Sequence, residues 1–143
     1  ILADLQSDGR LSVTELADRI GLSLSPCHRR VRALEQSGVI RGYKAQLDPG
    51  NLGFNFSALV FVTLREGDRQ AVEAFETAVM EVPQVIQAQR LFGDPDYLLQ
   101  VVSRDLSAFQ QLYDEQLSSL PSVQRLISTL VMKNVVQDRP LPL

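Results

Sequence analysis

The 143-residue sequence has little of several residue types on which common protein classes depend. Its single cysteine, Cys27, excludes an intrachain disulfide and cannot supply a zinc site by itself. Its single histidine, His28, has no adjacent ligands or acid–base partner, which argues against a metal centre or catalytic triad. A phosphate-binding loop is also missing. No apolar run reaches the roughly 18 residues of a membrane span, and no leader is present. We therefore expect a soluble, cytoplasmic protein without catalytic or metal-binding residues.

Hydrophobic residues make up 45% of the chain and charged residues 22%, a balance that permits one ordinary domain or two small ones. The net charge of −3 is unevenly distributed. The segment from Arg19 to Lys44 contains six basic residues and one acidic residue, a net charge of +5. The segment from Asn51 onward contains seven basic and eleven acidic residues, a net charge of −4. A basic region followed by an acidic one indicates two domains, the first with a polyanionic partner. The alternative is that the basic residues form a solvated helix face without a partner.

Two consecutive helices are predicted near the N-terminus. A Ser-x-x-Glu capping box at Ser12 begins the first, whose apolar residues recur at helical spacing until Gly21. Ser23 or Ser25 caps the second helix, and Pro26 suits its first turn. Because only three residues separate the helices, they form a helix-turn-helix. Residues 1–5 are interpreted as the end of a preceding helix that completes the small core.

The second helix has one apolar and one donor-rich face. Leu24, Cys27, Val31 and Leu34 anchor the helix on its apolar face. Serine, histidine and arginine side chains occupy the opposite side and its flanks, where a recognition helix meets DNA bases. Basic residues in the extended segment that follows would contact phosphate. The predicted DNA-binding residues are Ser23, Ser25, His28, Arg29, Arg30, Arg32, Arg41 and Lys44. The alternative is a set of solvated arginines near Glu35.

The rest of the chain indicates an α+β fold. Breakers at 48–53 mark a linker. The later pattern is strand, helix, strand, strand, helix, strand, the ferredoxin-like βαββαβ order. We expect strands at 57–64, 85–92, 97–103 and 123–135, and helices at 69–81 and 106–119. The predicted domains are a helix-turn-helix, winged-helix-like DNA-binding domain at 1–47, a linker at 48–55, and a ferredoxin-like effector-binding and oligomerisation domain at 56–143.

Several predicted strands are apolar at consecutive positions, as in 59–62 and 98–99, so both faces of the sheet are apolar. Two helices in this topology cover one face only, and the other would leave a large exposed patch. We expect the same face of a second copy to cover it. A two-fold dimer would also present two helix-turn-helix units to half-sites about one DNA turn apart. Alternatively, the linker segment of the same chain covers part of that sheet face.

The segment Gly93-Asp94-Pro95-Asp96-Tyr97 joins the two central predicted strands. Asp and Pro are ordinary turn residues, so a hairpin turn is the simpler interpretation. The functional alternative is that Asp94 and Asp96 accept hydrogen bonds from the ammonium of a free amino acid. Two aspartates without further ligands do not indicate a metal site.

These motifs together resemble the Lrp/AsnC family of bacterial and archaeal transcription regulators over essentially the whole chain. The resemblance rests on five segments: Asp8-Gly9-Arg10, Gly21-Leu22-Ser23, Pro26 to Glu35, Gly38 to Tyr43, and Gly93 to Leu98. It implies dimers that can assemble into octamers and a small amino acid or related metabolite as effector. It also implies Gly93, Asp94, Asp96 and Tyr97 as effector-pocket residues. The family's first helix begins earlier than Ile1, so we expect that residues preceding it are missing.

The function predicted from these features is sequence-specific binding of double-stranded DNA by a transcription regulator. Its assembly or DNA affinity would respond to the amino-acid effector, and no other cofactor is expected. The alternative is a metabolite-binding adaptor module whose helix-turn-helix contacts protein in place of DNA.

Overall fold

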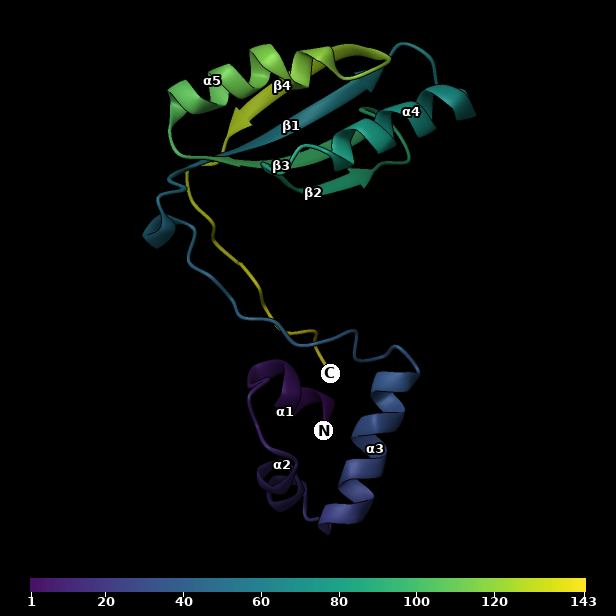
Figure 1. The fold of residues 1–143 in the computed structure, drawn as a ribbon, viewed down its shortest axis with the longest axis vertical. Coiled ribbons are helices and arrows are strands. Elements are labelled where there is room, and N and C mark those ends of the chain that lie inside the picture. The colour runs from purple at the N-terminus through teal and green to yellow at the C-terminus, as the bar shows by residue number, and fades with distance from the viewer. The chain divides into compact units, whose positions relative to one another are not determined.

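The computed structural model describes residues 1–143, which divide into two compact units (Figure 1). The first unit contains residues 1–47 together with 135–143, and the second contains residues 48–134. This division differs from the predicted ferredoxin-like domain at 56–143, because residues 135–143 lie with the first unit. The sheet's last strand ends at Leu130, and the main chain of Leu141 is hydrogen-bonded to Gln6 in the first unit. None of the helices has the length and apolar character required to cross a membrane.

Three helices form the first unit: α1 (Leu2–Ser7), α2 (Val13–Ile20) and α3 (Leu24–Gln36). The predicted capping box begins α2: the hydroxyl of Ser12 accepts a hydrogen bond from the Glu15 amide at 3.1 Å, and the Glu15 carboxylate accepts one from the Ser12 amide at 2.8 Å. The Ser12 hydroxyl also donates to the Glu15 carboxylate. The hydrogen bonds from the Ser12 amide and hydroxyl lower the pKa of Glu15. Gly21, with φ of 68°, ends α2 in the left-handed conformation that glycine adopts without a steric penalty.

The core of the first unit is small. Its buried residues are Leu16, Ala17, Cys27 and Val31. Leu24 was expected to anchor α3, but it is 54% exposed, because it precedes the packed part of the helix, which begins one turn later at Cys27. Residues 39–47 form no strand, so an extended segment follows the helix-turn-helix.

The second unit has the predicted βαββαβ order. Its strands are β1 (Phe56–Leu64), β2 (Val85–Arg90), β3 (Tyr97–Ser103) and β4 (Val123–Leu130), and its helices are α4 (Arg69–Met80) and α5 (Leu106–Glu115). Short 3-10 turns lie at Gly50–Leu52 and Leu117–Ser119. The strands form one antiparallel sheet in the order β2-β3-β1-β4. β4 is five residues shorter than the predicted strand, which ran to Val135.

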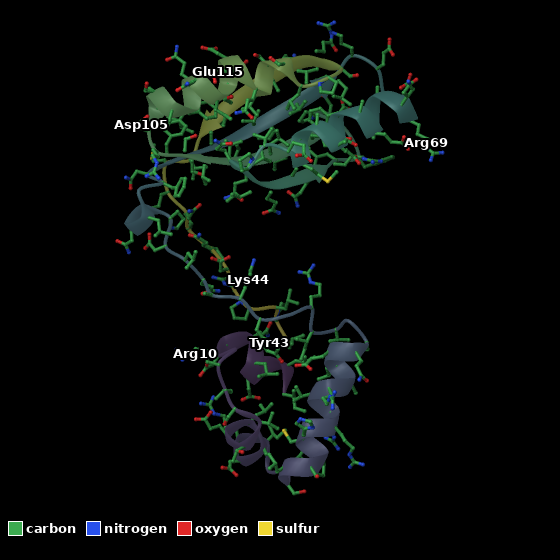
Figure 2. The ribbon with its side chains drawn as sticks, in the orientation of Figure 1. Arg10, Tyr43, Lys44, Arg69, Asp105 and Glu115 are labelled. Carbon is green, nitrogen blue, oxygen red and sulfur yellow. The ribbon has the colours of Figure 1, made fainter.

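Both helices of the second unit begin at aspartate caps and pack on the same face of the sheet (Figure 1). Asp68 accepts from the Ala71 amide at 2.8 Å, and Asp105, labelled in Figure 2, accepts from the Ala108 amide at 2.7 Å. Alternate residues of β1 and β3 are buried beneath the helices, as the two-residue period of a strand requires. The remaining residues of both strands face the side that no helix covers.

Candidate functional site

The polar face of α3 is fully available to a partner. Cys27 and Val31 hold the opposite face against α2, and the thiol of Cys27 points to the carbonyl of Val13 at 3.8 Å. Every predicted contact residue of this helix is exposed: Ser25, His28, Arg29, Arg30 and Arg32. The helical period therefore separates a buried anchor from a cationic surface.

The arginines of α3 are not neutralised by the acid on the same helix. No salt bridge links Arg29, Arg30 or Arg32 to Glu35. The Glu35 carboxylate instead accepts a hydrogen bond from the Tyr43 hydroxyl at 3.0 Å, and burial together with this bond raises the pKa of Tyr43. The guanidinium groups consequently remain available for an external anion.

The beginning of α3 differs from the expected capping pattern. Ser23 occupies the N-cap position, but its hydroxyl makes no capping bond, and its carbonyl accepts from the Cys27 amide at 3.3 Å. The hydroxyl is therefore not required by the helix. Arg41 and Lys44 are exposed on the extended segment after α3, where Figure 2 labels Lys44 beside Tyr43.

The loop between β2 and β3 is held to β1 by Asp96. Its carboxylate accepts from the Leu64 amide at 2.7 Å, and its own amide donates to the Val62 carbonyl at 2.9 Å. Its carbonyl accepts from the Leu91 amide at 2.8 Å, which closes the loop. Asp96 thus has a structural role in the loop, which is consistent with the turn interpretation for this residue.

Tyr97 also points inward. It is 3% exposed, packs against Phe75 with ring centroids 4.5 Å apart, and its hydroxyl donates to Glu76 at 2.7 Å. Burial and this bond raise the pKa of Tyr97 to about 12, and the same bond, with Arg90, lowers the pKa of Glu76. The Arg90 guanidinium completes the cluster by pairing with Glu76.

Two residues of this cluster, Glu76 and Arg90, are not predicted by the sequence. Arg90 lies on β2, opposite Tyr97 of β3, and Glu76 reaches both from α4. Neither residue belongs to a local motif. A signal in the sequence would have required knowledge of the strand register.

The remaining loop residues face solvent. Gly93 and Asp94 are exposed, and Gly93 has a φ of 142°, a backbone conformation that favours glycine. The Asp94–Pro95 peptide is cis. Phe92, just before the loop, is fully exposed. The structure therefore divides the four predicted effector residues into an exposed pair, Gly93 and Asp94, and an inward pair, Asp96 and Tyr97.

The uncovered face of the sheet carries large apolar side chains in a row. Phe61 of β1 pairs with Leu98 of β3 on one side and with Ile127 of β4 on the other. Leu98 and Phe61 are half-buried, and Ile127 is 48% exposed. In a monomer, this row of side chains across three strands would leave apolar surface in contact with water.

Comparison with known proteins agrees with both units. Residues 1–41 match the winged helix-turn-helix DNA-binding family, and residues 57–141 match the Lrp/AsnC ligand binding domain. The leucine-responsive regulatory protein of Escherichia coli K12 is 41% identical over 141 residues, which cover 99% of this chain and 86% of that protein.

Solved structures show the same similarity. A transcriptional regulator of Neisseria meningitidis in complex with L-methionine has a TM-score of 0.92 and 37% identity, covering 99% of this chain and 91% of that one. A feast or famine regulatory protein of M. tuberculosis complexed with L-methionine has a TM-score of 0.85 and 31% identity, covering 96% and 90%. With its helix-turn-helix and its ligand-binding sheet both matched, the chain belongs to the Lrp/AsnC family of amino-acid-responsive, DNA-binding transcription regulators.

Proposed function

We propose that this regulator binds its operator through the exposed face of α3. The observation that carries this proposal is the separation of faces on one helix: Cys27 and Val31 are buried, while Arg29, Arg30 and Arg32 are exposed and unpaired with Glu35. Arginine can bridge guanine O6 and N7 or clamp a phosphate. Ser23, Ser25 and His28 add donors on the same side, and Arg41 and Lys44 contact phosphate, which positions the helix.

The first experiment measures DNA affinity by fluorescence anisotropy on fragments that the wild-type protein selects from a random-sequence pool. Arg29→Ala and Arg32→Ala should each weaken binding about tenfold, since a good base or phosphate contact contributes roughly 1–3 kcal/mol. Wild-type affinity should fall steeply as salt rises.

Arg69→Ala is the matched control, because Arg69 is an exposed arginine of the second unit (Figure 2). It removes the same charge and should leave the affinity unchanged. Equal affinities for wild type, Arg29→Ala and Arg32→Ala would show that the DNA-contacting face lies elsewhere.

The working form in this proposal is a two-fold dimer closed through the uncovered sheet face. Phe61, Leu98 and Ile127 form an apolar row that the same row of a second copy would bury. Two copies would then place two recognition helices on half-sites about one DNA turn apart. The octamer that the resemblance implies would be an assembly of such dimers.

The effector in this proposal is a small amino acid, and the loop at 93–97 is part of its pocket. Two related regulators are crystallised with L-methionine, which supports this ligand class. The exposed Asp94 carboxylate would accept from the ligand ammonium, and the loop amide at Gly93 would meet its carboxylate. Asp96 and Tyr97 contribute by positioning the loop, through the Leu64 amide and through Glu76.

Thermal unfolding with L-methionine and L-leucine as probes tests the effector site. A ligand at about 100 times its dissociation constant adds roughly 2.7 kcal/mol to the stability of the wild-type protein. Asp94→Asn should abolish the shift while the unliganded protein melts as wild type does, because the side chain is exposed. Asp114→Asn, an exposed aspartate on α5, is the control and should respond normally. A normal response in Asp94→Asn would limit Asp94 to its role in the turn.

A further inference from the structure

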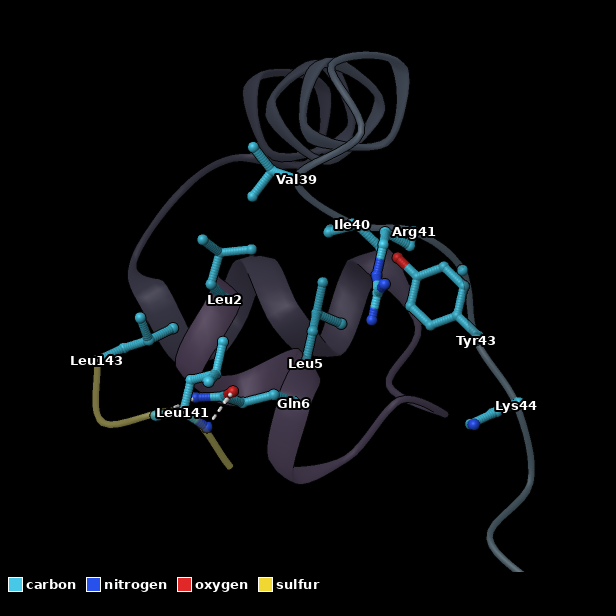
Figure 3. Close-up of a pocket in the computed structure, with 11 residues that line it drawn as sticks. Leu2, Leu5, Gln6, Val39, Ile40, Arg41, Tyr43, Lys44, Leu141 and Leu143 are labelled. Carbon is cyan, nitrogen blue, oxygen red and sulfur yellow. Dashed lines mark hydrogen bonds between the residues drawn. The ribbon is translucent and has the colours of Figure 1, made fainter. Parts of the chain in front are cut away.

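A groove in the first unit lies between α1, residues 39–44 and the residues 139–143 that return after the sheet (Figure 3). Its volume is about 650 Å³. The apolar part of its wall comes from three separate segments: Leu2, Leu5, Val39, Ile40, Leu141 and Leu143. No acidic side chain lines it, and Arg41 and Lys44 are among its lining residues. The returning segment and the two residues proposed to contact phosphate therefore line the same groove.

Gln6 of α1 holds the returning segment by its main chain. The side-chain amide of Gln6 donates to the Leu141 carbonyl at 2.8 Å, and its side-chain oxygen accepts from the Leu141 amide at 2.9 Å. Figure 3 shows these two side by side. The Leu141 and Leu143 side chains remain 70% and 72% exposed. The attachment of the segment thus depends more on the two hydrogen bonds of Gln6 than on burial of the leucine side chains.

The sequence around Leu141 favours this pairing. Pro140 and Pro142 flank Leu141, and proline restricts both its own φ and the conformation of the residue before it. The Leu143 amide donates to the Leu141 carbonyl at 2.8 Å, which forms a tight turn around Pro142. The segment loses little conformational freedom when it docks. Because prolines lack an amide hydrogen, the Leu141 amide is the one donor that residues 140–142 can offer to Gln6.

We propose that residues 139–143 are a docking segment of the DNA-binding unit, held on α1 by Gln6 so that they form one wall of this groove, and that the docked segment keeps residues 39–44 ordered. The chain passes between the two units twice, near residue 48 and near residue 135. Docking turns the second passage into an additional attachment of the DNA-binding unit to strand β4. The segment bonded to Gln6 is this chain's own, not that of a second copy.

The consequence for DNA rests on the proposed function. Arg41 and Lys44 belong to the segment that lines the groove together with the docked residues, and residues 39–47 form no strand that would order them otherwise. Loss of docking would let these two cations move away from the phosphates. We expect DNA affinity to fall a few-fold and its salt dependence to become shallower, because fewer phosphates are neutralised.

Hydrogen–deuterium exchange on the full chain tests docking without reference to DNA. In the wild type, the amides of Leu141 and Leu143 should be protected. Gln6→Leu removes both bonds and should raise their exchange rates about tenfold, with faster exchange also at 39–44. Gln46→Leu, at an exposed glutamine outside the groove, should exchange as wild type does. Unprotected amides in the wild type, or unchanged protection in Gln6→Leu, would overturn the proposal.

A second variant leaves α1 intact in case Gln6→Leu disturbs the helix. Leu141→Pro removes the donor from the other side of the pair and should raise exchange at Leu143 and at 39–44. Mixing Gln6→Leu chains with Leu141→Pro chains distinguishes own-chain docking from exchange between copies. Recovery of protection at Leu143 of the Gln6→Leu chain in the mixture would mean that it docks on another copy, contrary to the proposal.

Anisotropy with the selected DNA completes the test. Gln6→Leu and Leu141→Pro should both bind a few-fold more weakly than wild type with a shallower salt dependence, and Gln46→Leu should not. If both variants undock but bind DNA as wild type does, the ordering role is wrong. If the wild type itself does not bind DNA, the proposed function fails while the exchange data still decide docking.

Discussion

The two units differ in how much of their own chain they bury. Four residues form the buried core of the first unit, whereas fourteen form that of the second. The first unit also carries the unpaired cations of α3, while the second carries the apolar row of its open sheet face. The smaller unit therefore gains relatively more from its helix caps and from the bonds of Gln6 to Leu141, and the larger one has an apolar face that none of its own helices covers. One chain thus combines a DNA-binding unit with a small core and a ligand-binding unit with a larger one.

The largest expected effect concerns the open sheet face. Phe61→Lys places a charge in the middle of the Leu98–Phe61–Ile127 row, and the proposed dimer would bury two such charges without partners. We expect dimerisation, measured by analytical ultracentrifugation, to weaken at least about a thousandfold, which corresponds to roughly 4 kcal/mol.

The control for Phe61→Lys is Gln110→Lys, which adds the same charge at an exposed position on α5. It should leave the dimer unchanged. A Phe61→Lys protein that sediments like the wild type would mean that the apolar face is covered by something other than a second copy, and the contrast between the units would then need another explanation.

The next effect concerns the small core. Leu16 is 1% exposed and belongs to the four-residue cluster, so Leu16→Ala should destabilise the first unit by about 3 kcal/mol. Because the second unit has its own core, circular dichroism should show loss of helix while tryptic digestion still yields an intact fragment of about residues 48–134. Cooperative loss of both units at one temperature would show that they do not fold independently.

The smallest effect concerns the cluster at the base of the loop. The pKa of Tyr97 rises to about 12 in the folded protein against about 10 when unfolded, so the folded state holds this proton more tightly. The stabilisation is complete below pH 10 and is lost as pH rises toward 12. We expect the free energy of unfolding to fall by about 2 kcal/mol over that interval, measured by urea titration at each pH.

Tyr97→Phe should flatten this alkaline dependence and cost about 1 kcal/mol at pH 7, because it removes the hydrogen bond to Glu76. Tyr113→Phe, at a half-buried tyrosine of α5, is the control and should keep the dependence. An identical pH profile in Tyr97→Phe and wild type would assign the alkaline transition to other groups.

Local features were predictable from the sequence. The capping box at Ser12, the left-handed end of α2 at Gly21 and the bounds of β3 at 97–103 agree with the structure, since each depends on neighbours a few residues away. The donor-rich face of α3 followed from its helical period in the same way. The βαββαβ order, confirmed by the sheet, followed from the sequence of short periodic segments.

The end of the chain and the interior of the loop could not be predicted this way. Gln6 and Leu141 are 135 residues apart, and no periodicity relates them. Asp96 looks like an ordinary turn residue until the fold brings the Leu64 amide to its carboxylate, and Tyr97 faces inward only because Phe75 and Glu76 lie beneath it.

The amino-acid sequence by itself determined the helices, strands and their faces, because these follow from caps and from periods of 3.6 and two residues. The tertiary structure decided which distant polar groups meet: Gln6 with Leu141, Asp96 with Leu64, and Tyr97 with Glu76 and Arg90. Such pairs depend on strand register and on how the chain returns, and both are set by packing of the whole unit.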